Sequence, residues 1–386
     1  MKSAKAKRLN KIEEYYFSSK LREIEEMNRS GENVINLGIG NPDLRPPAGV
    51  VDKLTESSKD PGNHGYQSYR GISALRQAFS EWYKIYYGVD LDPDSEILPL
   101  MGSKEGIFYI SMAFLNEGDK VLVPDPGYPT YKAVSEMVGG EAVPYDLTEK
   151  NRWFPDLDSL DKSDLSQVKL MWVNYPHMPT GAKANRSFFK ELVDFGKKHD
   201  IILCHDNPYS FILGEDPISL LETENSKNYV LELNSLSKSH NMAGWRVGMI
   251  AGNPEFINYI NDVTSNIQSG MFLPIQYAAI KALENSKSWY FELNKTYSMR
   301  RDLVWEILES LGCIFGKDQG GLFVWARIPG ESDSYDFSDE ILRKTRIFIT
   351  PGSIFGKNGS GYIRISLCSP EEVLLEAKER IVQNFK

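Results

Sequence analysis

The feature that most constrains the fold is a regular alternation of short apolar runs with helical stretches, which starts at about residue 72. The runs are rich in Val, Ile, Leu and aromatic residues and cover residues 97–101, 120–123, 141–145, 169–173, 201–205, 229–233 and 247–251. Stretches with helical periodicity lie between them, for example at 103–115, 131–138 and 187–199. Strands that alternate with helices of this length predict an α/β domain, in which helices cover both faces of a mostly parallel sheet.

Both ends of the chain follow a different pattern. The helix expected between residues 11 and 30 has one apolar stripe, formed by Phe17, Leu21, Ile24 and Met27. Residues 34–42 predict a short strand that enters a glycine-rich turn. A long helical region at about 275–311 precedes predicted strands and helices, which cover residues 321–327, 336–345, 347–350, 362–367 and 370–385. These elements predict a second, smaller α+β unit. A chain of 386 residues is long enough for two domains.

Composition narrows the class of protein. A formal net charge of −9 argues against nucleic acid as the main partner, because proteins that bind phosphate backbones usually carry a basic face. The basic start of the chain is not followed by the apolar segment of a secretory signal, and no apolar run approaches the roughly 18 residues that cross a membrane. The three cysteines lack metal-binding spacing and the five histidines are scattered. We therefore expect a cytoplasmic protein without a metal site.

The strings Ser235-Leu-Ser-Lys238 and Gly244-Trp-Arg246-Val-Gly248 indicate specific chemistry. The lysine follows a predicted strand and is therefore placed to reach a pocket, where an amine with a lowered pKa can form a Schiff base with an aldehyde. Arg246 offers a planar fork that suits a phosphate. For the short lysine motif alone, a surface lysine and a structural arginine are the alternative. The longer string, with all its parts in register, favours a binding site.

This string resembles the lysine motif of the class I and II aminotransferases, fold-type I enzymes that use pyridoxal 5'-phosphate. The resemblance extends from about residue 33 to the C-terminus, and its details are most similar to the aspartate and LL-diaminopimelate types. It implies a large α/β domain at 46–285 that binds the cofactor, and a discontinuous small α+β domain made of residues 1–45 and 286–386. It also implies a homodimer with shared active sites.

The resemblance assigns catalytic roles to three residues. Lys238 would hold the cofactor covalently and then move a proton during the reaction. Asp206 would place its carboxylate against the ring nitrogen of the cofactor, and Tyr209 would donate a hydrogen bond to the phenolate oxygen. Both residues follow the apolar run at 201–205, and ligands of α/β sheets bind beyond the carboxyl ends of strands. On its own, a strand-end aspartate is equally compatible with capping a loop.

A second group is assigned to the cofactor phosphate. Gly102, Ser103 and Lys104 follow the run at 97–101 and open a predicted helix, whose first amides and dipole favour an anion. The resemblance makes them a phosphate cradle that Ser235 and Arg246 complete. Outside that context, Ser103 is equally well explained as a helix cap.

Two tyrosines are assigned to the cofactor as well. Tyr128, in Asp125-Pro-Gly-Tyr128-Pro-Thr-Tyr131, occupies the position of the family's stacking aromatic residue, and packing into the core is the alternative. Tyr66, in Tyr66-Gln-Ser-Tyr-Arg-Gly71, corresponds to a tyrosine that reaches the phosphate of the neighbouring subunit.

One motif departs from the family pattern. Asn174-Tyr-Pro-His-Met178-Pro-Thr-Gly181 has a methionine where the family has the asparagine that bonds the cofactor phenolate oxygen. A thioether cannot donate a hydrogen bond. Asn174 remains a candidate cofactor ligand, and the sequence leaves open whether Asn174 or His177 substitutes.

The substrate side is expected late in the chain and at its start. Arg364, in Tyr362-Ile-Arg364-Ile-Ser, matches the family's arginine for the substrate α-carboxylate, which a guanidinium binds bidentately. Gly38 and Gly40 would let the backbone approach the same carboxylate. A second carboxylate would need a further cation, and the candidates by count are Arg22, Arg29, Arg45 and Arg70.

The resemblance therefore implies an aminotransferase that moves an amino group from an α-amino acid to a 2-oxo acid by a ping-pong mechanism. One alternative is a different reaction of the same cofactor on the same scaffold, such as β-elimination or racemisation. A cofactor-binding regulator is the other, but the roughly 30 residues before Asn33 are too few for a DNA-binding module.

Overall fold

The structure is a computed structural model that describes residues 5–6, 8–9, 14, 16–214 and 216–385. Its centre is a seven-stranded sheet in the order β2-β8-β7-β6-β5-β3-β4. In chain order the strands are β2 (Ile97–Leu100), β3 (Lys120–Asp125), β4 (Glu141–Asp146), β5 (Val168–Val173), β6 (Ile202–Asp206), β7 (Val230–Ser235) and β8 (Gly248–Gly252). β8 runs antiparallel to β2 and β7, and the other neighbours are parallel. The predicted, mostly parallel sheet is confirmed.

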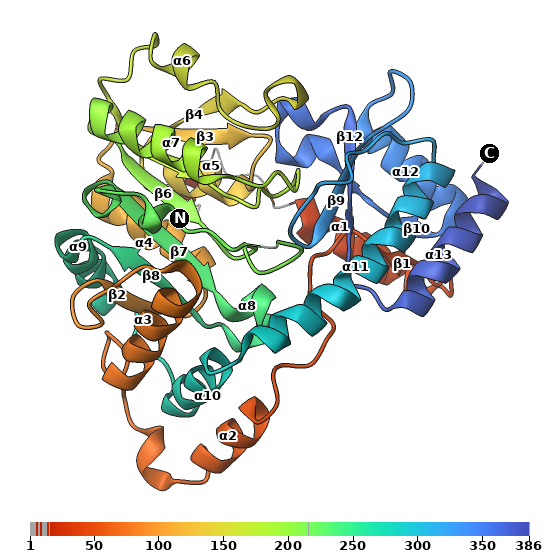
Figure 1. Ribbon diagram of the computed structural model, residues 1–386. Helices are drawn as coiled ribbons and strands as arrows, with labels where there is room; N and C mark the ends of the chain where they lie inside the picture. Colours follow the sequence, from red (N-terminus) through yellow and green to blue (C-terminus); the bar gives the residue numbers. More distant parts are fainter. Residues whose placement is uncertain (1–4, 7, 10–13, 15, 215, 386) are drawn as a thin grey trace, which may run out of the picture.

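Helices cover both faces of this sheet (Figure 1). Along β5, Leu170 and Trp172 belong to one hydrophobic core and Met171 and Val173 to another, because side chains alternate across a strand. The core around Trp172 is completed by α4 (Ser103–Phe114), α5 (Pro129–Met137) and α9 (Pro254–Ser265). The core around Met171 is completed by α2 (Val50–Ser57), α3 (Ser73–Tyr87), α7 (Arg186–His199) and α10 (Leu273–Leu283). A one-turn helix, α6 (Leu157–Leu160), precedes β5.

The second part of the structure combines residues 16–36, drawn in red, with the segment from residue 287 onward, drawn in cyan to blue in Figure 1. A three-stranded antiparallel sheet has the order β11-β12-β9, and β1 pairs with β10 in parallel. These strands are β1 (Ile35–Asn36), β9 (Phe323–Arg327), β10 (Ile347–Phe348), β11 (Thr350–Pro351) and β12 (Tyr362–Ser366). The helices are α1 (Tyr16–Arg29), α11 (Lys287–Ser310), α12 (Ser334–Thr345) and α13 (Glu371–Asn384). Most of them share one hydrophobic core, while the bounds at residues 45 and 285 stay a prediction.

An ion network around one buried arginine ties the N-terminal segment to the C-terminal helices. Arg300 of α11 is only 2% exposed. Its guanidinium donates to both carboxylate oxygens of Asp43, at 2.7 and 2.9 Å, and to Glu371 of α13 at 3.0 Å. A buried arginine requires such partners, because an unpaired charge in the interior is costly.

Two helices differ from the sequence-based expectation. The long helical region is divided into α10 and α11, because Ser286 has an extended backbone and begins a new helix. In α1 the buried residues are Phe17, Lys20 and Ile24, whereas Leu21 is 41% exposed. Lys20 tolerates burial because its amine pairs with Glu23 and Asp339. Residues 11–13 and 15 of the expected helix lie outside the described part of the chain.

None of the described helices is both long enough and apolar enough to cross a membrane.

Candidate active site

Lys238 lies just beyond the carboxyl end of β7. The chain leaves the strand at Ser235 and forms a single helical turn, α8 (Leu236–Ser239), in which the Ser235 hydroxyl accepts a hydrogen bond from the amide of Ser237 at 3.2 Å. The Lys238 amine donates to the carbonyl oxygen of Gly40 at 2.5 Å. Burial lowers the pKa of Lys238. An amine with a lowered pKa is more often neutral, and a neutral amine is the form that attacks a carbonyl or accepts a proton.

Asp206 ends β6, which is the parallel neighbour of β7, so both side chains are at the same edge of the sheet. Carboxylate oxygen Oδ2 accepts a hydrogen bond from the Tyr131 hydroxyl at 2.9 Å. Oxygen Oδ1 is buried and has no hydrogen-bond partner among the described residues. Burial raises the pKa of Asp206 to about 6, although the Tyr131 hydrogen bond acts in the opposite direction. A buried acceptor without a partner is the feature that a protonated ring nitrogen would satisfy.

Tyr128 and Tyr209 are close enough to Asp206 for its charge to raise the pKa of both hydroxyls, although burial is the larger cause. Both therefore stay protonated near neutral pH and can donate hydrogen bonds. The Tyr209 ring meets Phe323 of β9 edge-on at 6.0 Å, and the half-buried Tyr128 ring meets Tyr131 edge-on at 5.6 Å. Tyr209 thus connects the large sheet to the three-stranded sheet.

The turn before α4 has the geometry of an anion site. Gly102 has φ of +91°, which glycine adopts without strain. A Cβ atom at this position would lie 2.1 Å from Nη2 of Arg246, so the guanidinium packs directly against the glycine. Arg246 itself has φ of +56° and donates through Nη1 to the carbonyl of Ala243 at 2.9 Å. A guanidinium beside the amino end of a 12-residue helix, which begins at Ser103, favours a phosphate.

Two further residues predicted for the phosphate are exposed. Lys104 lies over the Tyr128 ring, with its amine 5.8 Å from the ring centroid. Tyr66 is 94% exposed, in the loop between a short helical turn and α3. Its predicted role toward a neighbouring subunit stays a prediction.

The turn in which Met178 replaces the expected asparagine is held by hydrogen bonds of the neighbouring side chains. The Asn174 amide donates to the carbonyl of Asp206 at 2.6 Å, and its oxygen accepts from the amide of Met178 at 2.7 Å. His177 pairs with the Thr180 hydroxyl at 2.8 Å, and burial lowers the pKa of His177 to about 3. Asn174 thus fastens the turn to the end of β6. The Met178 sulfur accepts from Nη1 of Arg364 at 3.2 Å.

Arg364 of β12 is buried among aromatic rings and carbonyl groups. Its guanidinium carbon lies 3.8 Å from the centroid of Phe323 and 4.7 Å from that of Phe355, and Nη2 donates to the carbonyl of Gly38 at 2.7 Å. Aromatic faces on a guanidinium fix its plane, which is the requirement for binding a carboxylate with two parallel hydrogen bonds.

Gly38 and Gly40 allow the N-terminal turn to pack against the small sheet. A Cβ atom would lie 2.4 Å from the Phe348 ring at position 38, and 2.3 Å from the Phe323 ring at position 40. The two glycine carbonyls accept hydrogen bonds from Arg364 and Lys238. This turn therefore links the predicted carboxylate-binding arginine to the predicted cofactor lysine.

The four arginines that are candidates for binding a second carboxylate have different surroundings in the structure. Arg22 and Arg29 lie on the exposed side of α1 and pair with Glu14 and Glu25. Arg70 donates to the carbonyl of Asp94 at 2.9 Å and to Asn258 at 3.1 Å. Arg45 is exposed, and its carbonyl accepts from the side chain of Asn241, three residues after Lys238. Arg45 is thus the one whose chain segment contacts the lysine loop.

Tyr131 and its stacking partner Trp172 were not among the predicted site residues. The sequence places Tyr131 three residues after Tyr128, which caps α5, so the two side chains are neighbours at the start of this helix. Among the described residues, no group of His, Cys, Asp and Glu side chains has the arrangement of a metal site.

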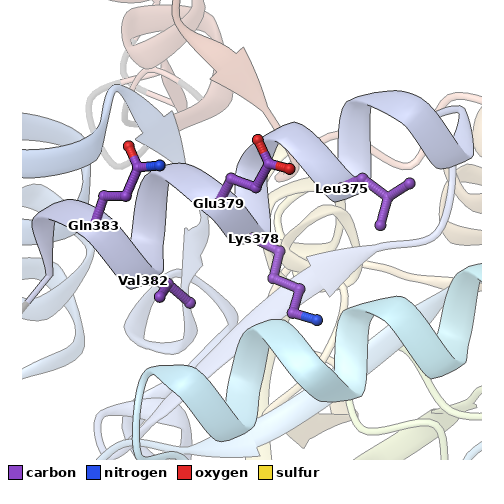
Figure 2. Close-up of a pocket in the computed structure, with 5 residues that line it drawn as sticks. All are labelled: Leu375, Lys378, Glu379, Val382 and Gln383. Atoms are coloured by element: carbon purple, nitrogen blue, oxygen red, sulfur yellow. The ribbon is translucent and has the colours of Figure 1, made fainter.

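A surface depression of about 250 Å³ lies elsewhere, along α13 (Figure 2). It is lined by Leu375, Lys378, Glu379, Val382 and Gln383. Lys378 points toward α11 and pairs with Glu306 at 2.6 Å. Because all the lining residues belong to one helix, the depression is separate from the group at the strand ends.

Comparison with known proteins agrees with this geometry. The family model described as aminotransferase class I and II matches residues 32–381. The LL-diaminopimelate aminotransferase of Dehalococcoides mccartyi is 41% identical over 99% of this chain and 98% of its own length. That of Halothermothrix orenii is 42% identical over 97% of each chain.

Solved structures agree as well. Apo-BacF from Bacillus subtilis superimposes with a TM-score of 0.95 at 37% identity and covers 99% of this chain and 98% of its own. The aspartate aminotransferase of Thermus thermophilus with maleate has a TM-score of 0.92 at 25% identity, with 99% of each chain covered.

Proposed function

Because the chain belongs to the class I and II aminotransferases, which are pyridoxal-phosphate-dependent enzymes that transfer an amino group from an amino acid to a 2-oxo acid, we propose that the residues around Lys238 form its active site. One observation carries this proposal. A half-buried lysine with a lowered pKa and a buried aspartate with an unpartnered oxygen stand beyond neighbouring strand ends. A second reaction of the same cofactor has no specific observation in its favour.

The residues present fit pyridoxal 5'-phosphate. Lys238 would bind its aldehyde carbon, and the free Oδ1 of Asp206 would pair with the ring nitrogen. Ser103, at the start of α4, and Arg246 would hold the phosphate, next to Gly102, whose missing side chain leaves room. When bound, the cofactor supplies an electron-withdrawing ring that stabilises negative charge at the substrate α-carbon.

The phosphate and ring contacts involve further residues. Ser235 and Lys104 lie at the same edge of the sheet and would add to the phosphate grip. Tyr128 would stack on the ring, and Tyr209 would donate its hydroxyl hydrogen to the phenolate oxygen, because burial keeps that hydroxyl protonated. Asn174 would contribute indirectly, by fastening the turn that carries Met178.

Proton transfer is assigned to Lys238. Its amine is held by the Gly40 carbonyl, and burial favours its neutral form, which can take a proton from the substrate α-carbon. General acid–base catalysis by a positioned group typically supplies about 10²–10⁴-fold in rate. Asp206 complements this role, because above a pH of about 6 its carboxylate is ionised and can keep the ring nitrogen protonated.

Substrate binding is assigned to Arg364. Its plane is fixed by Phe323 and Phe355, and a carboxylate that meets two of its N–H groups is oriented as well as neutralised. Gly38 and Gly40 would bring the backbone to the same carboxylate. Because every α-amino acid carries this carboxylate, Arg364 cannot discriminate between donors.

For the amino donor we propose LL-diaminopimelate. The support is the similarity to two enzymes of that name over almost the whole chain. The distal end of such a substrate carries a second carboxylate, and Arg45, on the segment that contacts the lysine loop, is our candidate for it.

The experiment is a donor screen with the purified holoenzyme. LL-diaminopimelate, aspartate, glutamate and phenylalanine are each mixed with the enzyme, and the loss of bound-cofactor absorbance and the formation of the 2-oxo acid are followed. We expect LL-diaminopimelate to give the highest kcat/KM. Turnover of phenylalanine or aspartate with an equal or higher kcat/KM would contradict the substrate assignment, and β-elimination or racemisation products would contradict the reaction.

We further propose a cytoplasmic homodimer in which Tyr66 contacts the phosphate bound by the partner subunit. Its 94% exposure in the single chain leaves the Tyr66 side chain accessible to a second subunit. Tyr66→Phe should keep the dimer, as judged by sedimentation, and raise the cofactor dissociation constant. An unchanged constant would contradict the assignment.

A further inference from the structure

Tyr131 occupies a protected position behind the candidate active site. It is the third residue of α5 and is only 1% exposed. Tyr128 stands one turn earlier, and the two rings meet edge-on, with planes 85° apart. Tyr128 caps the amino end of α5, so the two side chains are neighbours at the start of this helix.

The Tyr131 hydroxyl contacts the carboxylate that the proposed function depends on. It donates to Oδ2 of Asp206 at 2.9 Å, and it is the only described side chain that donates to this carboxylate. Burial raises the pKa of Tyr131 well above its usual value, so the hydroxyl remains a donor throughout the working pH range. With Oδ2 occupied, Oδ1 is the oxygen left for another group.

The Tyr131 ring is itself held in place by Trp172. The two rings are parallel within 4°, with centroids 4.9 Å apart, and Trp172 is fully buried on β5. Trp172 stands beside Cys204, which is two residues before Asp206 and on the same face of β6. The Trp172 indole therefore fixes the orientation of the Tyr131 ring. The Tyr131 hydroxyl in turn fixes the orientation of the Asp206 carboxylate.

We propose that Tyr131, backed by Trp172, is the positioning residue that turns Oδ1 of Asp206 toward the cofactor ring nitrogen and keeps the carboxylate ionised. This inference rests on the proposed function, in which Asp206 pairs with that nitrogen. The physical basis is the hydrogen bond to a buried charge, which stabilises the ionised form and removes one of its two orientations.

The test uses Tyr131→Phe with Tyr145→Phe as its matched control. Tyr145 is also buried, and its hydroxyl donates to the carbonyl of Trp172 at 2.7 Å, so each variant loses one buried tyrosine hydroxyl next to the same residue. Of these two tyrosines, only Tyr131 donates a hydrogen bond to Asp206. The cofactor dissociation constant of the cofactor-free protein, and kcat and KM of the loaded enzyme, are measured for both variants and for the wild type.

We expect Tyr131→Phe to bind pyridoxal phosphate roughly ten- to hundredfold more weakly, the range of a hydrogen bond to a charged group. Its kcat should fall while KM for the amino donor stays within about twofold, because the substrate carboxylate is held elsewhere. Tyr145→Phe should match the wild type in all three constants. A Tyr131→Phe protein that is merely less stable, with an unchanged dissociation constant and kcat, overturns the proposal.

If Tyr131→Phe does not fold, Trp172→Phe decides the matter. This variant keeps the Tyr131 hydroxyl but gives the Tyr131 ring a smaller stacking partner. Several-fold weaker cofactor binding would support the proposal, and wild-type binding would overturn it. Failure of the underlying function is recognised separately, because the wild type and Tyr145→Phe would then not bind pyridoxal phosphate or transaminate.

Discussion

The cofactor side and the carboxylate side of the candidate site are built in opposite ways. The cofactor side stands at neighbouring strand ends of one sheet, where parallel pairing of β6 and β7 brings Asp206 and the turn that contains Lys238 to the same edge. The carboxylate side depends on segments far apart in the sequence, because Arg364 donates to Gly38, 326 positions away. The first side uses charged and hydroxyl groups, and the second encloses one cation in aromatic rings. A change on the first side should therefore affect cofactor and chemistry together, and a change on the second should affect substrate alone.

The largest effect is expected on the cofactor side, for Lys238→Ala. Without the amine, neither covalent attachment nor proton transfer at the α-carbon is possible, and a positioned acid–base group alone is worth about 10²–10⁴-fold. We expect transamination to become undetectable while circular dichroism shows an intact fold. A turnover rate equal to that of the wild type would refute the central assignment.

Asp206→Ala is expected to come next, with a loss of roughly 10²–10³-fold in kcat, similar to that for other groups that stabilise developing charge. Cofactor content after gel filtration should also fall, since the ring nitrogen loses its partner. Normal turnover with full cofactor content would exclude Asp206 as that partner.

Asp206 should also impose a cost on stability that depends on pH. Its folded pKa of about 6 lies above the ordinary value of 3.8, so the folded protein holds this proton more tightly than the unfolded chain. The stability that Asp206 contributes is therefore present at low pH and is lost as pH rises to about 6. We expect Asp206→Asn to stabilise the cofactor-free protein by about 1–3 kcal/mol at pH 8, at 1.36 kcal/mol per pKa unit.

Urea unfolding at pH 8 and pH 5 measures this effect. The gain from Asp206→Asn should be smaller at pH 5, where most of the wild-type carboxyl is already protonated. An equal gain at both pH values would argue against a raised pKa.

On the carboxylate side, Arg364→Lys replaces a planar fork by a point charge. The expected loss of a charge-assisted hydrogen bond is about 1.5–3 kcal/mol, or roughly ten- to hundredfold in kcat/KM. The loss should be similar for every α-amino acid donor, and cofactor content should not change. If activity falls only with acidic donors, Arg364 binds the distal carboxylate, and if cofactor is lost, it belongs to the phosphate site.

The smallest effect is expected where the two sides meet. Met178 contacts Arg364 through sulfur, and its amide is fastened to Asn174 and thereby to the end of β6. Met178→Asn would add a donor for the cofactor phenolate oxygen. A hydrogen bond to the phenolate oxygen would reduce the negative charge that stabilises the protonated form of the cofactor-bound lysine nitrogen. We therefore expect the pH-dependent absorbance change of the bound cofactor to move to lower pH, with kcat/KM altered only a few-fold. An unmoved titration midpoint would show that this side chain does not reach the cofactor.

The contrast between the sides also explains what could be predicted from the sequence. Asp206 and Lys238 directly follow apolar runs, so the alternation of strands and helices was enough to bring them to one sheet edge. Arg364 was identified from its local string, but its contact with Gly38 depends on a pairing between β1 and β10 that has no local signal. Tyr131 was missed because a buried aromatic residue one turn from another is usually core, and only its distance to Asp206 distinguishes it.

The ion network around Arg300 has a consequence for the order in which the chain matures. Asp43 is made well before its partners on α11 and α13, because Arg300 follows it by 257 positions. The strand pairing of the seven-stranded sheet involves no residue after Gly252. The sheet can therefore assemble before the segment that contains Asp43 has met its partners. Gly40 then reaches Lys238 as a late event. The lysine therefore gains its Gly40 contact last, from a segment that is made before the strand leading to the lysine.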